Sequence, residues 1–236
     1  MPKSFFKFKQ FTIRQEGAAM KVGTDGVLLG AWIGLGGVST ALDIGTGSGV
    51  IALMIAQRCN AVVDAVEIDS DSANQAKSNF DSSPWKNRVT VYNMSFQNFY
   101  AVTKTKYDLI VSNPPYFSNS LKSAFQKRNI ARHVDELPYH QLIEGVAKLL
   151  GNNGKFCAVF PYTEGNVFIA QAANAELFCT RKTNVYSHPH KPVLRLLLEF
   201  SFMKEKLVEN ELSIHNLEGN YSDDYKKLTK DFYLAF

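Results

Sequence analysis

The sequence predicts an α/β protein whose sheet is mostly parallel with one antiparallel strand, and whose helices lie on both faces. Three observations carry this prediction. Apolar, β-branched runs alternate with helix-like runs from residue 40 onward, which is typical of βαβ units. The late runs Cys179–Ser187 and Val193–Met203 are joined by a link too short for a parallel crossover. A glycine-rich loop, Gly45–Gly49, lies between a strand and a helix, where such folds bind ligands.

Residues 1–33 are expected to form an N-terminal arm and a helix. Phe6–Arg14 alternates and predicts a short strand or hairpin packed on the main body. Lys21–Gly26 predicts a turn, and Val27–Ile33 predicts a helix after it. The alternation that follows predicts strands at 40–45, 61–67, 88–94, 107–112 and 154–160, and helices at 48–58, 70–81, 138–150 and 164–176.

Two later segments have a distinct character. Residues 117–136 are polar, basic and weakly periodic, and we expect them to form a mobile substrate loop. The tail Tyr221–Phe236 is aromatic and charged, and Asp223 or Asp224 is expected to cap a final helix there.

The composition is that of a globular protein. The chain has 236 residues, of which 45% are hydrophobic, so a sizeable core is available and the disordered class is excluded. It has no apolar run long enough to cross a membrane, and its N-terminus lacks the apolar core of a signal peptide. We therefore expect one domain, residues 1–236, in the cytoplasm.

Cysteine and histidine patterns predict no metal site. Cys59, Cys157 and Cys179 are widely spaced and form no Cys-x-x-Cys pair, so they are expected to be free thiols of a reducing compartment. His188-Pro189-His190 lacks further ligands nearby in the sequence.

The glycine loop favours S-adenosylmethionine over a dinucleotide. In Asp43-Ile44-Gly45-Thr46-Gly47-Ser48-Gly49 the glycines follow a G-x-G-x-G spacing, whereas the dinucleotide fingerprint is G-x-G-x-x-G. Glycines there permit positive φ and let a ligand approach the backbone closely. Asp43 suits a ligand that carries a cationic ammonium group better than it suits a diphosphate. A dinucleotide and a plain glycine turn are the alternatives.

The next predicted strand, Ala61–Glu67, ends in an acid. A carboxylate at that strand end accepts hydrogen bonds from a ribose diol, and Glu67 is the candidate, with a solvated acid as the alternative. Asp69 is expected to be the N-cap of the following helix.

Asn113-Pro114-Pro115-Tyr116 follows the apolar run Leu109–Val111 and predicts a site for an exocyclic amine. Such a nitrogen is a poor nucleophile, because its lone pair is delocalised into the ring. The Asn113 side-chain oxygen and the Pro114 carbonyl offer acceptors for its N–H groups. The prolines stiffen this backbone, and Tyr116 offers a face on which a base stacks. An ordinary strand-to-loop turn is the alternative.

Positive charge gathers in two segments of a chain whose net charge is +4. Met1–Lys21 has five lysines and arginines against one acid, and Ser118–Arg132 has four against none. The second segment directly follows the amine site, as expected for contact with a polyanion; solvated surface charge is the alternative. The candidate nucleic-acid contacts are Lys7, Lys9, Arg14, Lys122, Lys127, Arg128 and Arg132, and the interleaved Phe6, Phe8, Phe11 and Phe125 are candidates for base stacking.

Several of these segments together resemble bacterial tRNA1(Val) (adenine-37-N6)-methyltransferases over nearly the whole chain. The segment Lys21-Val22-Gly23-Thr24-Asp25-Gly26 and the tail are specific to that family, whereas the glycine loop and Asn-Pro-Pro-Tyr are shared by many amino-methyltransferases. The resemblance implies a Rossmann-like, seven-stranded class I methyltransferase sheet. It also implies methyl transfer from S-adenosylmethionine to N6 of adenosine 37 in valine tRNA, leaving S-adenosylhomocysteine. The resemblance rests on Phe8–Ile13, Lys21–Trp32, the glycine loop, Ser112–Tyr116 and Tyr221–Phe236.

The resemblance also implies roles for individual residues. Glu67 would hold the cofactor ribose, and Thr24 and Asp25 would close over the cofactor. Related enzymes often carry an acid for the cofactor adenine where Asn93-Met94-Ser95 stands, so Asn93 or Ser95 must substitute. The methionine end of the cofactor would be held by Asp43, Gly45, Thr46, Gly47 and Gly49, and the target base by Asn113, Pro114, Pro115 and Tyr116.

Four other functions are compatible with the same motifs. A glutamine N5 protein methyltransferase would use the same amine chemistry, but such enzymes usually carry a separate N-terminal helical domain, for which we expect no room. The others are a ribosomal RNA guanine-N2 methyltransferase, a DNA adenine-N6 methyltransferase and a non-catalytic RNA-binding factor. The sequence predicts neither an oligomeric state nor a membrane partner.

Overall fold

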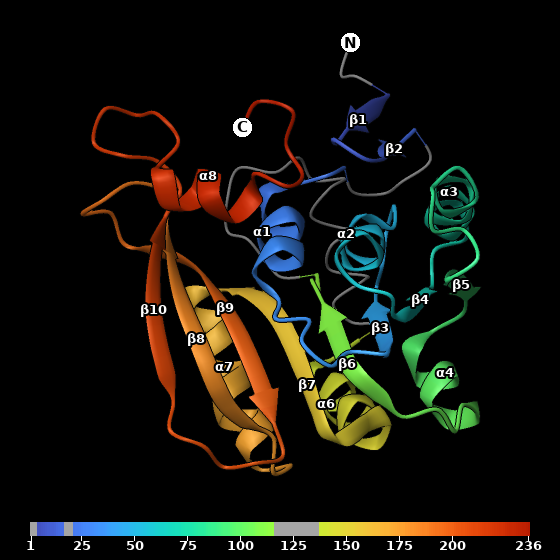
Figure 1. Cartoon of the computed structure of the whole chain (residues 1–236). Helices are drawn as coiled ribbons and strands as arrows, with labels where there is room; N and C mark the ends of the chain where they lie inside the picture. Colours follow the sequence, from blue (N-terminus) through green and yellow to red (C-terminus); the bar gives the residue numbers. More distant parts are fainter. Residues whose placement is uncertain (1–3, 17–20, 116–136) are drawn as a thin grey trace, which may run out of the picture.

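The computed structural model describes residues 4–16, 21–115 and 137–236, and the account below concerns these residues (Figure 1). Within them one sheet is built from β3 (Thr40–Ile44), β4 (Val62–Glu67), β5 (Val89–Asn93), β6 (Tyr107–Ser112), β7 (Leu150–Pro161), β8 (Phe178–Tyr186), β9 (Val193–Ser201) and β10 (Val208–Ser213). The spatial order is β10-β8-β9-β7-β6-β3-β4-β5. Strand β9 is antiparallel to both neighbours, and the other pairs are parallel. The predicted mostly parallel sheet with one antiparallel strand is confirmed.

Helices pack on both faces of this sheet, as expected. One hydrophobic cluster includes Ala41 and Leu109, and the other includes Leu42 and Ile110. Because successive strand residues point to opposite faces, the two clusters lie on opposite sides of the sheet. The first cluster takes in α1 (Thr24–Trp32), α2 (Val50–Arg58), α3 (Ser70–Asp81) and α8 (Asp223–Thr229), and the second takes in α4 (Phe96–Val102), α6 (Tyr139–Leu149) and α7 (Tyr162–Ala173).

The first helix begins earlier than the sequence predicted. The expected turn at Lys21–Gly26 is instead the start of α1, which begins at Thr24. One of its glycines lies at a close helix contact: a Cβ at Gly30 would lie 2.7 Å from Met54 Sδ on α2. A larger residue at that position would force the Met54 side chain to shift.

Two elements were not predicted at all. Helix α4 is short, and Ser95 caps it by accepting a hydrogen bond from the Asn98 amide at 3.2 Å. Among the residues that the structure describes, the sheet has eight strands where seven were expected, and β10 is the additional one. Its sequence, Val-Glu-Asn-Glu-Leu-Ser, is mostly exposed and lacks the apolar pattern by which strands are recognised.

The cap of the last helix also differs from expectation. The Ser222 hydroxyl accepts a hydrogen bond from the Tyr225 amide at 3.1 Å, so Ser222 is the N-cap of α8. The prediction that Asp223 or Asp224 caps this helix is wrong. Both acids lie in its first turn, where their negative charge interacts favourably with the positive end of the helix dipole.

The parallel strands bring their carboxyl ends to one edge of the sheet. Ile44 of β3 is level with Val66 of β4 and with Ser112 of β6. The N-terminal hairpin of β1 (Phe5–Lys7) and β2 (Thr12–Arg14) lies beyond this edge, at the end toward which β6 points in Figure 1. Ligands of open α/β sheets bind outside such an edge, so we expect the ligand-binding site there.

Within the described parts of the chain, no helix combines the length and the apolar character needed to cross a bilayer. Those same parts contain no group of three or more His, Cys, Asp or Glu residues that could hold a metal ion.

Candidate active site

The glycine loop has the backbone shape that only glycine adopts freely. Gly45, Gly47 and Gly49 have φ of 68°, 57° and 87°, all in the left-handed region. A Cβ at Gly49 would lie 2.3 Å from a Phe80 ring carbon, so this position also needs glycine for packing. A Cβ at Gly45 or Gly47 would meet no protein atom within 4 Å. The first two glycines therefore border open space in which a ligand can approach the backbone.

Asp43 lies beneath this loop and is fully buried. Its Oδ2 accepts hydrogen bonds from the Thr46 hydroxyl at 2.6 Å and from the Ala52 amide at 3.2 Å. Its Oδ1 is buried without a hydrogen-bond partner among the described residues. Burial raises the pKa of the Asp43 carboxyl from 3.8 to about 7, against the lowering effect of those two hydrogen bonds. A cationic ligand nearby would favour the ionised form.

Glu67 ties the glycine loop to the end of β4. Its Oε2 accepts from the Gly47 amide at 2.8 Å, and its Oε1 accepts from the Asp69 amide at 3.0 Å. The loop is further fixed because the Gly45 and Thr46 amides both donate to the Val66 carbonyl. The Glu67 carboxylate, 8% exposed, thus orients the backbone and retains acceptor capacity for a ligand hydroxyl. Asp69 caps α3 through the Ser72 amide at 2.8 Å, as predicted.

Asn113 stands at the end of the neighbouring strand, β6. The Ser112 hydroxyl donates to the Ile44 carbonyl at 3.0 Å and locks the two strand ends together. The Asn113 Oδ1 atom is buried and has no hydrogen-bond partner within the described residues. Buried acceptors of this kind are rare in native proteins and call for an explanation. An amine donor supplied by a substrate would satisfy this one.

Asn93 and Ser95 lie at the end of β5, but each already makes a structural contact. The Asn93 side-chain nitrogen donates to the Glu67 carbonyl at 2.9 Å and the Ile68 carbonyl at 3.2 Å. The Ser95 hydroxyl caps α4. The Asn93 carboxamide carries an acceptor oxygen besides its bonded nitrogen, which makes Asn93 the better of the two candidates for a cofactor adenine.

Thr24 and Asp25 open helix α1, and Asp25 forms an ion pair that the sequence did not indicate. Its Oδ2 accepts from Arg195 Nε at 2.9 Å. Arg195 lies in β9, where a single arginine interrupts an apolar run, and that interruption was the available signal. The pair fixes the start of α1 to the sheet, so it orients the segment that was expected to close over a cofactor.

These residues fit S-adenosylmethionine as a group. The open space above Gly45 and Gly47, the buried carboxyl of Asp43 and the unpartnered Asn113 oxygen meet at one edge of the sheet. An acid suits the ammonium of the cofactor, and the open space at Gly45 and Gly47 lets the cofactor approach the backbone closely.

Known proteins share both the sequence and the fold. The Methyltransferase small domain family matches residues 35–166. A tRNA1(Val) (adenine(37)-N6)-methyltransferase from Bacteroides fragilis is 46% identical over 235 residues, covering 99% of each chain. One from Trichodesmium erythraeum is 45% identical over 234 residues, covering 98% of each chain. The chain belongs to the tRNA1(Val) (adenine(37)-N6)-methyltransferase family.

A solved structure supports the fold assignment separately. A predicted O-methyltransferase from Agrobacterium tumefaciens superposes with a TM-score of 0.70 at 16% identity, covering 88% of this chain and 96% of the other. The shared architecture is the α/β methyltransferase sheet with flanking helices. The family assignment therefore agrees with the strand order described above.

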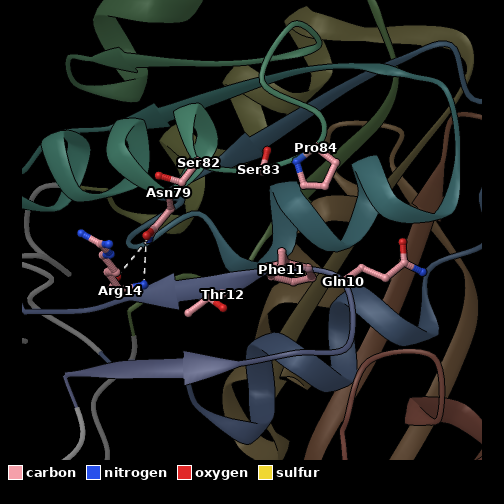
Figure 2. A pocket seen from close by; sticks show the side chains of 8 residues that line it. All are labelled: Gln10, Phe11, Thr12, Arg14, Asn79, Ser82, Ser83 and Pro84. Atoms are coloured by element: carbon pink, nitrogen blue, oxygen red, sulfur yellow. Dashed lines mark hydrogen bonds between the residues drawn. The ribbon is translucent and has the colours of Figure 1, made fainter.

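The basic residues of the N-terminal hairpin are placed unequally. Lys7 and Arg14 are exposed, and Arg14 borders a surface groove of about 600 Å³ between the hairpin and α3. Figure 2 shows Arg14 and Asn79 joined by hydrogen bonds at one end of this groove, with Gln10 and Pro84 at the other. Both exposed cations remain candidates for contact with the family's RNA substrate.

Asn79 is a residue that the sequence reasoning missed. Its side chain accepts from the Arg14 amide at 2.9 Å and donates to the Arg14 carbonyl at 2.9 Å and the Ser48 carbonyl at 2.8 Å. It thereby couples the hairpin to the glycine loop. The signal would have been a single asparagine on the buried side of a helix, where it is 2% exposed.

Lys9 and the aromatic residues of the N-terminal hairpin contact other parts of the protein. Lys9 Nζ donates to the Lys230 carbonyl at 2.6 Å and also to the Phe236 carbonyl, so it holds the tail against the hairpin. The prediction that Phe8 and Phe11 stack on bases is wrong, because they are 1% and 6% exposed and belong to the core. Phe6 is half-buried and packs against the same core.

The remaining predicted contacts lie outside the described residues. These are the candidate mobile loop 117–136 and, within or beside it, Tyr116, Lys122, Phe125, Lys127, Arg128 and Arg132.

Proposed function

We propose that this protein transfers the methyl group of S-adenosylmethionine to N6 of adenosine 37 in tRNA1(Val). The observation that carries the proposal is the buried, unpartnered Asn113 Oδ1 at the strand end beside the glycine loop. Its relatives' names supply the substrate, and the identity of about 45% extends over nearly the full length of both chains. The protein is thus a tRNA (adenine-N6)-methyltransferase.

Asn113 and Pro114 activate and aim the target amine. The Asn113 side-chain oxygen accepts one N–H bond, and the Pro114 carbonyl accepts the other. Accepting both protons localises the nitrogen lone pair, and fixing the amine in the line of transfer removes an entropic barrier. Because the Asn113 Oδ1 atom is already buried, a hydrogen bond to it is stronger here than it would be in water. Tyr116 stacks on the base after it leaves its place in the RNA.

The cofactor is held along the three neighbouring strand ends. Asp43 and the loop residues Gly45, Thr46, Gly47 and Gly49 take its methionine end. S-adenosylmethionine supplies an electrophilic methyl group on a sulfonium centre. Glu67 takes the ribose, Asn93 or Ser95 the adenine, and Thr24 and Asp25 cover the site from α1.

No residue of the chain needs to act as a general base before attack. The amine proton becomes acidic only once the nitrogen carries the new methyl group, and water then removes it. Catalysis by the protein is therefore positioning and electrostatic stabilisation, in which Asn113 has the largest part.

Residues 1–236 act as one methyltransferase domain in the cytoplasm, and basic segments flank the site. Lys7 and Arg14 contact phosphates on the hairpin side, while Lys122, Lys127, Arg128 and Arg132 contact them from the loop that follows Tyr116. Such contacts fix the register of the RNA on the protein and make binding salt-dependent.

A labelling experiment tests this function against its rivals. The protein is incubated with S-adenosylmethionine labelled in the methyl group and, separately, with bulk tRNA, ribosomal RNA, DNA or a release-factor protein. We expect label only in tRNA, recovered as N6-methyladenosine at position 37. Label in a protein glutamine, in ribosomal guanine or in DNA adenine would replace the proposal with that activity. The absence of label in every substrate would support a binding role.

A further inference from the structure

Four aromatic rings form a continuous stack beside β8 and β10, the strands farthest from β5 in the sheet order. The ring centroids of His188 and His215 are 4.7 Å apart at 20°, those of His215 and Tyr221 5.2 Å apart at 18°, and those of Tyr221 and Tyr225 5.1 Å apart at 15°. These nearly parallel planes match the stacked geometry of aromatic pairs. We call these four residues the ring ladder.

The ladder lies beyond the carboxyl ends of β8 and β10, on the same side of the sheet as the carboxyl end of β6 that carries Asn113. Strands β8 and β10 run in the same direction as β6, because β9 is antiparallel to both β7 and β8. His188 follows the end of β8 and His215 follows the end of β10, level with one another. β8 is three strand spacings from β6, about 14 Å across the sheet. The pairing registers place Ser112 level with Lys182 of β8, so His188 lies about 17 Å farther along the strand direction than Asn113. About six stacked nucleotides span the resulting ~22 Å at ~3.4 Å each.

The backbone holds the ladder rings in place. The His215 amide donates to the Ser187 carbonyl at 3.1 Å, and His215 Nδ1 lies 2.9 Å from the same oxygen. Residues His215 and Tyr221 form an isolated antiparallel bridge. An ordered stack loses little entropy when a further ring joins it.

The ladder has a buried end and a partly exposed end. Tyr225 is 2% exposed at the buried end, whereas Tyr221 is 45% exposed in the middle. His188 is partly exposed at the other end, and among the described residues no other ring stacks on it. A flat ligand placed on His188 would therefore continue the stack.

The turn that presents His188 has an unusual residue in it. The Lys191 amide donates to the His188 carbonyl at 3.3 Å, and His190 has a φ of 64°. With Pro189 between them, this is the pattern of a type II turn, whose third position favours glycine or asparagine. A histidine held in that conformation stores strain, and such strain collects at ligand-binding sites.

The charge around this turn suits a phosphate-bearing ligand. Residues 187–192, Ser-His-Pro-His-Lys-Pro, contain one lysine, two histidines and no acid. His190 and Lys191 are exposed. A flat ring beside exposed cationic and hydrogen-bonding groups is the combination by which proteins bind unpaired nucleotides.

We propose that the outer face of His188 receives an unpaired base of the RNA substrate, with Lys191 contacting the adjoining phosphate. This inference rests on the proposed function for its RNA, and it assigns a second contact about six nucleotides from the target adenosine. The ladder thus helps to hold the unstacked loop while the target base occupies the Asn113 site.

The test compares three variants by steady-state methylation of tRNA. His188→Ala removes the stacking face, and we expect KM for tRNA to rise roughly tenfold, within the range measured for loss of one base–aromatic stack. His188→Phe keeps a ring and is expected to restore KM to within about twofold, because stacking tolerates the exchange of one ring for another. Leu217→Ala changes a side chain that is 78% exposed in the neighbouring loop and is expected to leave KM unchanged.

Further readouts separate the ladder from a structural role and from the enzyme's function. We expect all variants to keep the wild-type melting temperature, the affinity for S-adenosylmethionine and kcat. His188→Ala should weaken binding to a stem-loop RNA and not to a fully paired duplex. An unchanged KM for His188→Ala, or equal weakening with the duplex, would overturn the ladder proposal while leaving methylation intact. A wild-type protein that methylates no tRNA would overturn the proposed function instead.

Discussion

Strands β4 and β6 lie on either side of β3, and each has a polar side chain at its carboxyl end. The two side chains differ in whether their oxygens have hydrogen-bond partners. Both carboxylate oxygens of Glu67 accept backbone amides, at 2.8 and 3.0 Å. The Asn113 carboxamide oxygen is buried with no partner among the described residues. A buried acceptor without a partner costs about 1–3 kcal/mol. Under the proposed function, Glu67 on the cofactor side is already held by the protein, whereas the Asn113 oxygen on the amine side receives its donor from the substrate.

We expect the largest effect on turnover from replacing Asn113, whose side-chain oxygen is the buried acceptor without a partner among the described residues. Replacing Asn113 with alanine removes one of the two amine acceptors, and we expect turnover to fall roughly 10²–10³-fold, as when an oxyanion-hole donor is lost. Cofactor affinity should not change, because Glu67 and the glycine loop are untouched. Single-turnover methylation and calorimetry of S-adenosylmethionine binding measure the two effects.

Asn166→Ala is the matched control for that variant. Asn166 is an exposed asparagine on α7 that donates to the Tyr162 carbonyl, and its loss should leave turnover intact. An Asn113→Ala enzyme with wild-type turnover would show that the buried oxygen has no part in methyl transfer.

Two glycine variants test whether the glycine loop binds the cofactor. Gly47 and Gly37 have φ of 57° and 76°, and a Cβ at either would meet no protein atom within 4 Å. Alanine at either position should therefore destabilise the fold equally, by about 1–2 kcal/mol from left-handed strain. Only Gly47→Ala should weaken S-adenosylmethionine binding, by about tenfold or ~1.4 kcal/mol. Urea unfolding and calorimetry report the two quantities, and equal cofactor affinities would place the ligand away from the loop.

A pH series tests the buried acid beneath the loop. Burial raises the Asp43 pKa to about 7, so the folded protein holds a proton that the unfolded chain releases near pH 4. This contribution to stability is present below pH 4 and is lost as the pH rises through 7. Binding of a cationic cofactor favours the carboxylate, so affinity should rise about tenfold from pH 6 to pH 8. Asp43→Asn should flatten this profile, and a wild-type profile that is already flat would contradict the role of Asp43.

The smallest effect is expected for a single surface cation. Lys7→Ala should weaken tRNA binding slightly and reduce the slope of log affinity against log salt by about 1. Lys104, which is exposed in the loop before β6 and so lies at the opposite edge of the sheet, provides the control. Filter binding at several salt concentrations measures both slopes. Equal slopes for the two variants would show that Lys7 of the hairpin does not contact the RNA.

The sequence predicted the parts of the fold that repeat a simple pattern. Alternating strands and helices, the left-handed glycines and the Asp69 cap all follow from local rules. The sequence did not predict β10, because an edge strand with an exposed polar sequence has no apolar period. It misassigned the start of α1, because Gly26 was interpreted as a turn residue, whereas it lies in the helix and faces Val50 of α2.

The site shows the same division. The sequence places Asp43, Glu67 and Asn113 together because each lies at or beside the end of an apolar strand, and parallel strands bring their ends together. Asn79 and Arg195 were missed because their partners, Ser48 and Asp25, are distant in sequence or lie on another element. Phe8 and Phe11 were misjudged because their spacing among lysines does not reveal that both rings turn into the core.

The most direct test of the account is a crystal structure of the protein with S-adenosylhomocysteine. The account predicts that the sulfur of this coproduct lies over the glycine loop and faces the Asn113 side-chain oxygen across the space that the target amine would fill. A coproduct bound elsewhere, or with its sulfur turned away from residue 113, would contradict the claim that β3 and β6 jointly form the transfer site.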